Sequence, residues 1–186
     1  MTDFTHRIAT EADIPALVAL MDRAITGPLA AFLSPEQIAA SRRLMGIDSQ
    51  IIADRTYFVV EADGIMAGCG GWSSRITEYG GDHTPGRVPA ALTPGADAAR
   101  VRAMYTAPEF LRRGVGRRIL ELSEAAAAAA GYDRAELVAT LGGEPLYRVA
   151  GYAEIERFED DRGGAPVPLV RMSKRLAGFV PAREPG

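Results

Sequence analysis

The stretch that decides the fold runs from Val101 to Gly131 and reads VRAMYTAPEFLRRGVGRRILELSEAAAAAAG. Residues 101–105 are mostly apolar or aromatic and can pair in a sheet. Pro108 has no N–H to donate to a strand ladder, so it ends that strand. Further on, the alanine run Ala125–Ala130 favours a helix, and Gly131 closes it. The predicted order is a strand, a basic turn with glycines, and a helix.

The turn between the strand and the helix has the composition of an anion site. The first amides of a helix have no internal partner and lie at the positive end of its dipole, so they can hold a phosphate. Gly114 and Gly116 let the backbone approach a bulky anion without a Cβ in the way. Arg112, Arg113 and Arg117 add charge suited to bidentate contacts. The alternative is an ordinary turn with solvated arginines, which a lone Gly-x-Gly pattern does not exclude.

Two well-known nucleotide-binding patterns do not fit this turn. A P-loop would end in Lys followed by Ser or Thr, whereas Arg117 and Arg118 follow Gly116 here. A dinucleotide fingerprint requires Gly or Ala where Ile119 stands. The sequence therefore argues against a nucleotide-binding regulatory domain of either class.

The stretch does resemble the acetyl-CoA-binding segment of the GNAT superfamily of N-acetyltransferases. In that family a strand ends near a Val/Thr-x-Pro step, and a turn of pattern Gln/Arg-x-x-Gly-x-Gly/Ala opens the next helix. Thr106-Ala107-Pro108 and residues 111–116 occupy those places here. Leu111 departs from the pattern, because the family most often has Gln or Arg there. The family contacts the pyrophosphate mainly with backbone amides, so the expectation of a CoA site holds.

A second segment, TLGGEPLYRVAGYAEIERFE at residues 140–159, resembles the C-terminal part of the same family. In the family a short helix with a Tyr precedes a Gly-Tyr or Gly-Phe step into a strand. Tyr147 and the pair Gly151-Tyr152 fall on those positions. The second match follows the first by about 30 residues, in the order that the family shows. The resemblance therefore covers roughly residues 5–174.

The resemblance implies a mixed α/β (α+β) fold. We expect a central, mostly antiparallel sheet of six to seven strands flanked by about four helices. Residues 5–175 would form a single domain, and residues 176–186 a short tail that is unstructured from residue 179. Strands are predicted at residues 6–9, 56–62, 65–72, 101–105, 134–139, 152–158 and 167–173. Helices are predicted after caps at Thr10 and Ser34, through the alanine run, and from Pro145.

The implied activity is direct transfer of an acetyl or other short acyl group from acetyl-CoA to a primary amine of a small molecule or peptide. A backbone N–H near the end of the central strand would polarise the thioester oxygen. The two strands around the central helix would splay, which frees backbone groups for the pantetheine amides. The cofactor-binding residues implied by the resemblance are Met104, Tyr105, Thr106, Leu111, Arg112, Arg113, Gly114, Val115, Gly116 and Arg117.

Tyr147 is the general acid that the resemblance implies, because the ordinary pKa of a Tyr, about 10, is near that of an alkyl thiol. The alternative is a Tyr that only packs over the cofactor or the sheet. The general base stays unassigned, since many family members have a Glu where this chain reads ARVRAM at residues 99–104. Four residues of the long loop 73–97 are candidates, directly or through water: Glu78, Asp82, His83 and Asp97. The missing Glu leaves a second option, a catalytically silent CoA-binding or regulatory module.

Composition limits the other choices. The chain has 186 residues, 47% hydrophobic and 24% charged, which fits one globular domain. A net charge of −3 gives no reason to expect nucleic acid or a membrane as a partner. The single cysteine, Cys69, excludes an internal disulfide and Cys-based zinc patterns, and we expect no metal. With no polar partner near it in sequence, Cys69 fits a buried small hydrophobe better than a nucleophile.

The expected partners are acetyl-CoA and an unidentified amine. Dimers are frequent in the family, so a homodimer is an open option. No apolar run approaches about 18 residues, and the N-terminus lacks a basic segment followed by an apolar one. We therefore expect a cytoplasmic protein.

Overall fold

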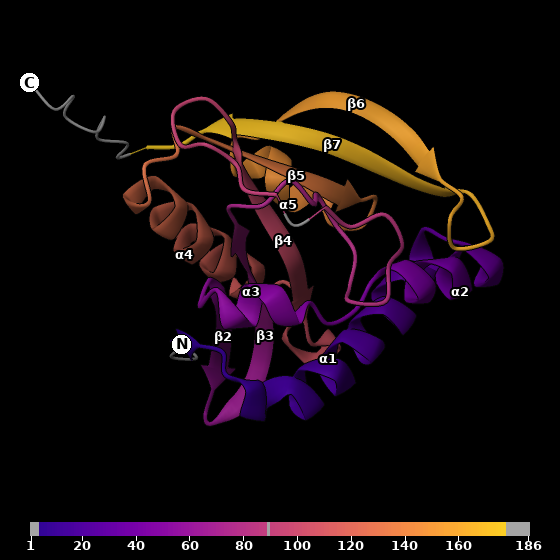
Figure 1. Cartoon of the computed structure of the whole chain (residues 1–186). Coiled ribbons are helices and arrows are strands. Elements are labelled where there is room, and N and C mark those ends of the chain that lie inside the picture. The colour runs from indigo at the N-terminus through magenta and orange to yellow at the C-terminus, as the bar shows by residue number, and fades with distance from the viewer. Residues whose placement is uncertain (1–3, 89, 178–186) are drawn as a thin grey trace, which may run out of the picture.

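A seven-stranded sheet forms the centre of the molecule in the computed structural model, which describes residues 4–88 and 90–177. The strand order is β1-β2-β3-β4-β5-β7-β6 (Figure 1). Neighbouring strands are antiparallel except β4 and β5, which are parallel. The mixed, mostly antiparallel sheet predicted from the sequence is thus confirmed. The strand bounds are β1 Phe4–Ile8, β2 Tyr57–Ala62, β3 Ile65–Ser73, β4 Ala99–Thr106, β5 Arg134–Thr140, β6 Ala153–Asp160 and β7 Val167–Arg175.

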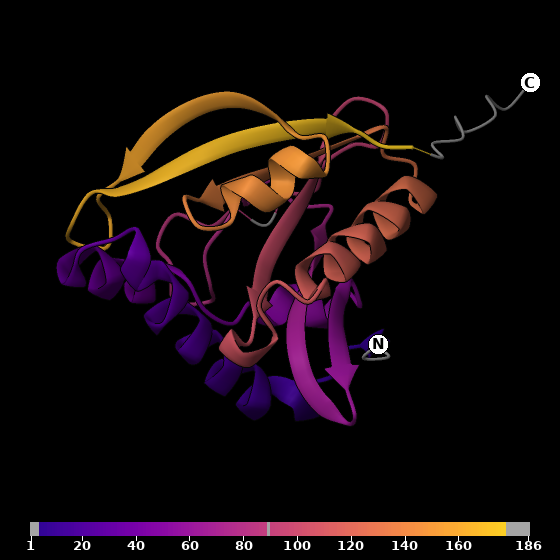
Figure 2. The ribbon, with the colours of Figure 1, turned by 180° about the vertical axis from the view of Figure 1, so that it is seen from behind.

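Five helices and three short 3₁₀ turns complete the described part of the chain. The helices α4 and α5 lie on one face of the sheet, in front in Figure 2, while α3 and the long β3–β4 loop lie on the face seen in Figure 1. The bounds are α1 Ile14–Thr26, α2 Pro35–Leu44, α3 Ser49–Ala53, α4 Val115–Ala129 and α5 Glu144–Val149, with 3₁₀ turns η1 Glu11–Asp13, η2 Pro28–Ala31 and η3 Pro108–Phe110. The tail predicted for residues 179–186 lies outside the described residues.

The N-terminal helices begin where the sequence predicted caps. The Gln37 amide donates to Ser34 Oγ at 3.3 Å, and the Ser34 amide donates to Gln37 Oε1 at 3.0 Å, which is a reciprocal capping box. The Thr10 amide donates to Asp13 Oδ2 at 2.8 Å, although here the box starts the 3₁₀ turn that leads into α1. The sequence did not predict the five-residue helix α3, which is too short to show an apolar period.

The segment Glu11–Ala31 has the length and hydropathy of a membrane-crossing helix, with 21 residues at a mean hydropathy of 1.3. In the structure it consists of η1, α1 and η2. Its large apolar side chains are used in the core, because Leu17, Leu20, Met21 and Ile25 are buried. The acidic Asp22 within it pairs with Arg42 of α2. In this structure 28% of its most apolar 18-residue window is buried.

Glycines of β3 allow α4 to lie close on the sheet. A Cβ built at Gly68 would stand 2.5 Å from Val115 Cγ1, and one at Gly70 would stand 2.6 Å from Ile119 Cγ2. Any larger residue at either position would push the helix away. The close approach places the N-terminal end of α4 beside the end of β4.

The parallel strands β4 and β5 pair over only two positions, Ala99 with Ala135 and Arg100 with Glu136. Beyond them β5 continues to pair with β7 as far as Thr140, whereas β4 runs on beside β3. The C-terminal halves of β4 and β5 therefore diverge. This divergence is the splay that the sequence analysis expected on either side of the central helix.

Candidate active site

A cavity of about 1040 Å³ lies where β4 and β5 diverge. It is lined by the end of β4, the β4–α4 turn and the β5–α5 segment, with a wall from α1, η2 and the long β3–β4 loop. All ten residues that the sequence predicted for cofactor binding line it, and so does Tyr147. Tyr105 and Val115 line it although both residues are nearly buried. The fold thus brings two distant sequence segments to one cavity.

The strand β4 is bulged at this cavity. Its pairing with β3 runs from Gly68 to Cys69 and resumes at Gly71, so Ala103 and Met104 face one residue of β3. Ala103 has a left-handed φ of 51°, which costs a residue with a Cβ about 1–2 kcal/mol. The buried Tyr57 hydroxyl donates to the Ala103 carbonyl at 2.7 Å and holds this conformation. The bulge releases backbone groups where the sequence analysis expected a polarising N–H.

The β4–α4 turn presents the start of α4 to the cavity. Arg112 and Gly114 both have left-handed φ values, 62° and 93°, and Gly114 adopts this conformation without a steric penalty. The first helical hydrogen bond runs from the Arg118 amide to the Gly114 carbonyl at 3.0 Å. The amides of residues 115–117 precede it and are available to an anionic ligand. The guanidinium of Arg113 lies 5.1 Å from the centre of the Phe110 ring at the same end.

Tyr147 projects from α5 on the opposite wall. Its hydroxyl donates to Met104 Sδ at 3.6 Å, so it reaches the bulge of β4. Its ring packs edge-on against Tyr152 at 6.0 Å. Burial raises the pKa of Tyr147 to about 12, so the phenol is protonated at neutral pH and can donate a proton. Its neighbour Leu146 narrows the groove, because a Cβ at Gly116 would lie 3.0 Å from Leu146 Cδ2.

Of the four general-base candidates, only Glu78 lines the cavity. Asp82 is outside it and accepts hydrogen bonds from a backbone amide and from Arg87. Asp97 accepts from a backbone amide near the end of the loop, and His83 is exposed. The structure therefore narrows the four candidates to one carboxylate in contact with the cavity.

Cys69 is buried and does not line the cavity. Burial raises the pKa of its thiol to about 12, so it is not a thiolate at neutral pH. The expectation of a small buried hydrophobe is confirmed, and a covalent step through Cys69 has no support. Among residues 4–88 and 90–177, no group of three or more His, Cys, Asp and Glu side chains is placed to hold a metal ion.

The sequence analysis did not single out several residues that line the cavity. Phe32 is half exposed although it is aromatic, and Tyr79 comes from the loop that shows no periodicity. Arg102 of β4 lines the cavity too, yet its side chain is only 1% exposed and lies 2.7 Å from the buried carboxylate of Asp48. The one sequence signal for Phe32 is its position as an aromatic residue between the end of one predicted helix and the cap of the next.

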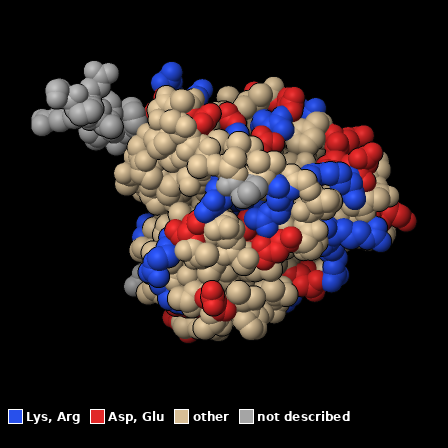
Figure 3. All heavy atoms as spheres, viewed as in Figure 1, with Lys and Arg blue, Asp and Glu red and all other residues tan. Residues whose placement is uncertain are grey.

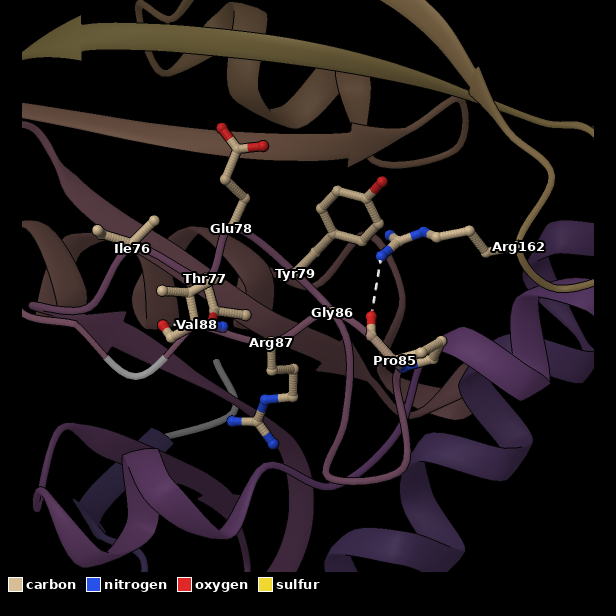
Figure 4. A pocket seen from close by; sticks show the side chains of 9 residues that line it. All are labelled: Ile76, Thr77, Glu78, Tyr79, Pro85, Gly86, Arg87, Val88 and Arg162. Atoms are coloured by element: carbon tan, nitrogen blue, oxygen red, sulfur yellow. Dashed lines mark hydrogen bonds between the residues drawn. The ribbon is translucent and has the colours of Figure 1, made fainter.

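A smaller hollow of about 290 Å³ lies along the long loop (Figure 4). It shares Glu78 and Tyr79 with the main cavity. In Figure 4 Glu78 extends toward β5 and β7, whereas Arg87 extends the other way toward α3, where it meets Asp48 at 2.6 Å. Arg162 donates to the Pro85 carbonyl at 3.2 Å and so ties the loop to the β6–β7 turn. The contacts of Arg87 and Arg162 thus hold in place the long loop, which forms one wall of the main cavity.

Charges of both signs lie side by side on the face seen in Figure 3. Polar contacts fasten the long loop to the C-terminal hairpin. Arg171 of β7 binds Glu78 of the loop through two hydrogen bonds of 2.9 and 2.8 Å, whereas Arg162 and Asp160, 2.7 Å apart, form an ion pair within the hairpin. The Tyr79 hydroxyl also donates to Asp160 at 2.9 Å. The loop is therefore part of the rigid frame around the cavity.

Comparison with known proteins gives a family match. The sequence model of the acetyltransferase (GNAT) domain matches residues 53–154, which is more than half of the chain. The match includes β4, the glycine turn, α4 and Tyr147. No curated protein sequence matches the chain.

Solved structures share the fold over almost the whole chain. A GCN5-related N-acetyltransferase from Rhodopseudomonas palustris aligns with a TM-score of 0.70 at 18% identity, covering 95% of this chain and 98% of that one. The PaiA N-acetyltransferase of Thermoplasma acidophilum, solved with coenzyme A, gives 0.62 at 14% identity, covering 94% and 99%. A ribosomal-protein-alanine N-acetyltransferase from Brucella melitensis gives 0.63 at 20%, covering 92% and 99%. These likenesses show the shared fold.

Proposed function

Because the chain belongs to the acetyltransferase (GNAT) domain family, we propose that it transfers an acetyl or other short acyl group from acetyl-CoA directly to a primary amine. The observation that supports this most is one cavity reached by the first amides of α4, the bulge of β4 and the hydroxyl of Tyr147. A structural neighbour solved with coenzyme A supports acetyl-CoA as the cosubstrate.

In this proposal the β4–α4 turn holds the pyrophosphate of acetyl-CoA. The amides of residues 115–117 point out of the start of the helix, where the dipole favours negative charge. Arg112, Arg113 and Arg117 line the same end of the cavity and add positive charge. The pantetheine arm then runs between β4 and β5, where unpaired backbone groups can bind its amides.

The chemical step needs few groups. The amine nitrogen attacks the thioester carbonyl carbon, a C–N bond forms, and negative charge gathers on the carbonyl oxygen beside the bulge of β4. The C–S bond then breaks, and the departing thiolate takes the proton of the Tyr147 hydroxyl. The tyrosinate regains a proton from solvent. The amine must lose its own proton before or during attack, to water or to a carboxylate.

The runner-up function is a CoA-binding or regulatory module without turnover. It is favoured by β4, which carries no Asp or Glu among residues 99–106. Glu78 at the cavity and the position of Tyr147 favour an enzyme.

Measurements of ligand binding and of turnover distinguish the acetyltransferase from the module without turnover. We expect acetyl-CoA and CoA to raise the melting temperature, because a ligand that binds only the folded state stabilises it, and ATP and NAD to leave it unchanged. We further expect CoA release from acetyl-CoA when primary amines are added. Stabilisation by CoA with no release for any amine would favour the silent module. Stabilisation by ATP or NAD alone would contradict both.

A further inference from the structure

The part of the cavity that faces away from the α4 amides has a distinct lining, which we call the acceptor half. It is formed by α1, η2 and the residue that follows η2, the residue that follows α2, and the long loop. Its principal side chains are Ile25, Leu29, Phe32, Met45, Glu78 and Tyr79. Five of these six are apolar or aromatic, and one is a carboxylate.

One aromatic side chain of the acceptor half, Phe32, is largely exposed. Ile25 and Leu29 are buried in the core, but Phe32 is 50% exposed and packs near Gly142 across the opening. A Cβ at Gly142 would lie 3.3 Å from the Phe32 ring, so the ring borders the mouth of the cavity. An acceptor with an apolar body would remove this ring from water, which is favourable.

Glu78 gives the acceptor half a negative charge. Both of its oxygens accept hydrogen bonds from Arg171, which fixes the carboxylate in place. Arg171 also pairs with Glu156 of β6. One guanidinium therefore serves two carboxylates, and one negative charge is left over. Each oxygen of Glu78 keeps a further lone pair for another donor, such as an ammonium group.

The positive charge that lines the acceptor half is already neutralised. Apart from the arginines of the β4–α4 turn, Arg102 of β4 is the one cation among the described residues that line the cavity, and its side chain is 1% exposed. It lies 2.7 Å from Asp48 and donates to the Gly80 carbonyl at 2.9 Å. An acceptor carboxylate would have to leave water without a cationic partner and would face Glu78, which is costly.

We propose that the acceptor is an apolar primary amine with no carboxylate beside the amine, and that Glu78 holds its ammonium group. This inference rests on the proposed acyl transfer and names the class of acceptor for that same cavity. Arg171 positions Glu78, and Phe32 covers the apolar body of the amine. The carboxylate binds the ammonium before the nitrogen is deprotonated and attacks the thioester.

Two compounds that differ by a single carboxylate test the proposed class of acceptor. 2-Phenylethylamine and phenylalanine share the ring and the amine, and only phenylalanine carries a carboxylate beside it. We expect kcat/KM for 2-phenylethylamine to exceed that for phenylalanine by about tenfold or more, because the site gives the carboxylate no partner. Equal values, or a preference for phenylalanine, would overturn the inference while acyl transfer stands. If acetyl-CoA binds but neither compound nor any other amine is acetylated, the proposed function itself fails.

The substitution Glu78→Gln tests whether Glu78 holds the ammonium group, and Glu156→Gln is the matched control. Both variants lose a carboxylate that contacts Arg171, but only Glu78 lines the cavity. We expect Glu78→Gln to raise KM for 2-phenylethylamine about tenfold with little change in acetyl-CoA affinity by calorimetry, and Glu156→Gln to change KM less than about threefold. Equal effects of the two substitutions would show that Glu78 acts only through the charge of the cluster and would overturn its role.

Phe32→Ala provides a test that does not disturb the loop. The ring is half exposed, so its removal leaves the core intact. We expect KM to rise about tenfold for 2-phenylethylamine and to stay the same for ethylamine, which has no ring to cover. An equal change for both amines would contradict an apolar acceptor half.

Discussion

Tyr147 shows how a single hydroxyl links the two walls of the cavity. It comes from α5, yet it reaches the sulfur of Met104 in the bulge of β4. We predict that Tyr147→Phe keeps acetyl-CoA affinity by calorimetry and lowers kcat by about 100-fold or more, because the ring stays and the proton is lost. Tyr152→Phe is the control, since Tyr152 packs against Tyr147 but does not line the cavity.

Other results for the variants Tyr147→Phe and Tyr152→Phe would assign Tyr147 a different role. A near-normal kcat in Tyr147→Phe, with chemistry shown to limit the rate, would leave the residue as packing only. Loss of both binding and turnover would mean that it supports the pocket. An equal loss of rate in Tyr152→Phe would point to the aromatic pair rather than to the proton.

The buried pair of Arg102 and Asp48 makes a stability prediction at the same scale. Asp48→Ala leaves a guanidinium that is 1% exposed without its carboxylate, so we expect a loss of about 3–5 kcal/mol in the free energy of unfolding by urea. The exposed pair of Asp22 and Arg42 is the comparison, and Asp22→Ala should cost no more than about 1 kcal/mol. Similar losses in the two variants would show that the pair at Asp48 is solvated.

Tyr147 and the pair of Arg102 and Asp48 show what could and could not be predicted from the sequence at the residue scale. Tyr147 was singled out because it belongs to a local motif, and its role stays a prediction. The pairing of Arg102 with Asp48 joins positions far apart in the chain, and neither is marked by its neighbours in sequence. Glu78 was one of four equal candidates until the fold placed it alone at the cavity. Side-chain contacts between distant segments depend on the register of the sheet, which local patterns do not encode.

In the proposed function, the turn between β4 and α4 binds the cosubstrate. A Cβ at Gly116 already lies 3.0 Å from Leu146 Cδ2, so the branched side chain of Gly116→Val would fill the groove between α4 and α5. We predict that this variant stays folded and binds acetyl-CoA at least about tenfold more weakly by calorimetry. Arg112→Ala should weaken binding less, and its effect should shrink as salt rises. Unchanged affinity in Gly116→Val would remove the assignment of the turn.

The end of β6, where Asp160 accepts a hydrogen bond from Tyr79 of the long loop, gives a prediction about acid. The Arg162 guanidinium holds the pKa of Asp160 below its ordinary value, although burial opposes this. A carboxyl whose pKa is depressed on folding stabilises the fold above its unfolded pKa of about 3.9, and this stability is lost as pH falls through the folded value. Asp160→Asn should therefore be less stable than the wild type at pH 7, with the gap in urea midpoint narrowing below about pH 4. A gap independent of pH would contradict the coupling.

At the element scale most of the fold could be predicted, because its signals are local. Caps, glycine turns and alternating apolar residues marked all seven strands and four helices. The helix α3 was missed because its five residues are too few to show an apolar period, although Asp48 caps it by accepting from the Gln50 amide at 3.1 Å. The bulge at Ala103 could not be predicted from the sequence either, because the Tyr57 hydroxyl that holds it comes from a distant strand.

At the scale of the whole molecule, the proposed function depends on how β4 and β5 separate. Two paired positions hold β4 to β5, and beyond them the strands separate around the cavity. Ligand amides and phosphates would meet one side of this cavity, and the acceptor amine the other. The arrangement follows from the order of the strands, with β5 paired to β7 and β4 to β3.

Direct detection of the product is the measurement that tests acyl transfer most plainly. The protein is mixed with acetyl-CoA and 2-phenylethylamine, and mass spectrometry follows CoA and N-acetylated amine together. Direct transfer predicts that the two products appear in equal amounts, with no acetylated protein as an intermediate, and that Tyr147→Phe slows both to the same extent. CoA that appears without acetylated amine, for this and every other primary amine supplied, would contradict the account.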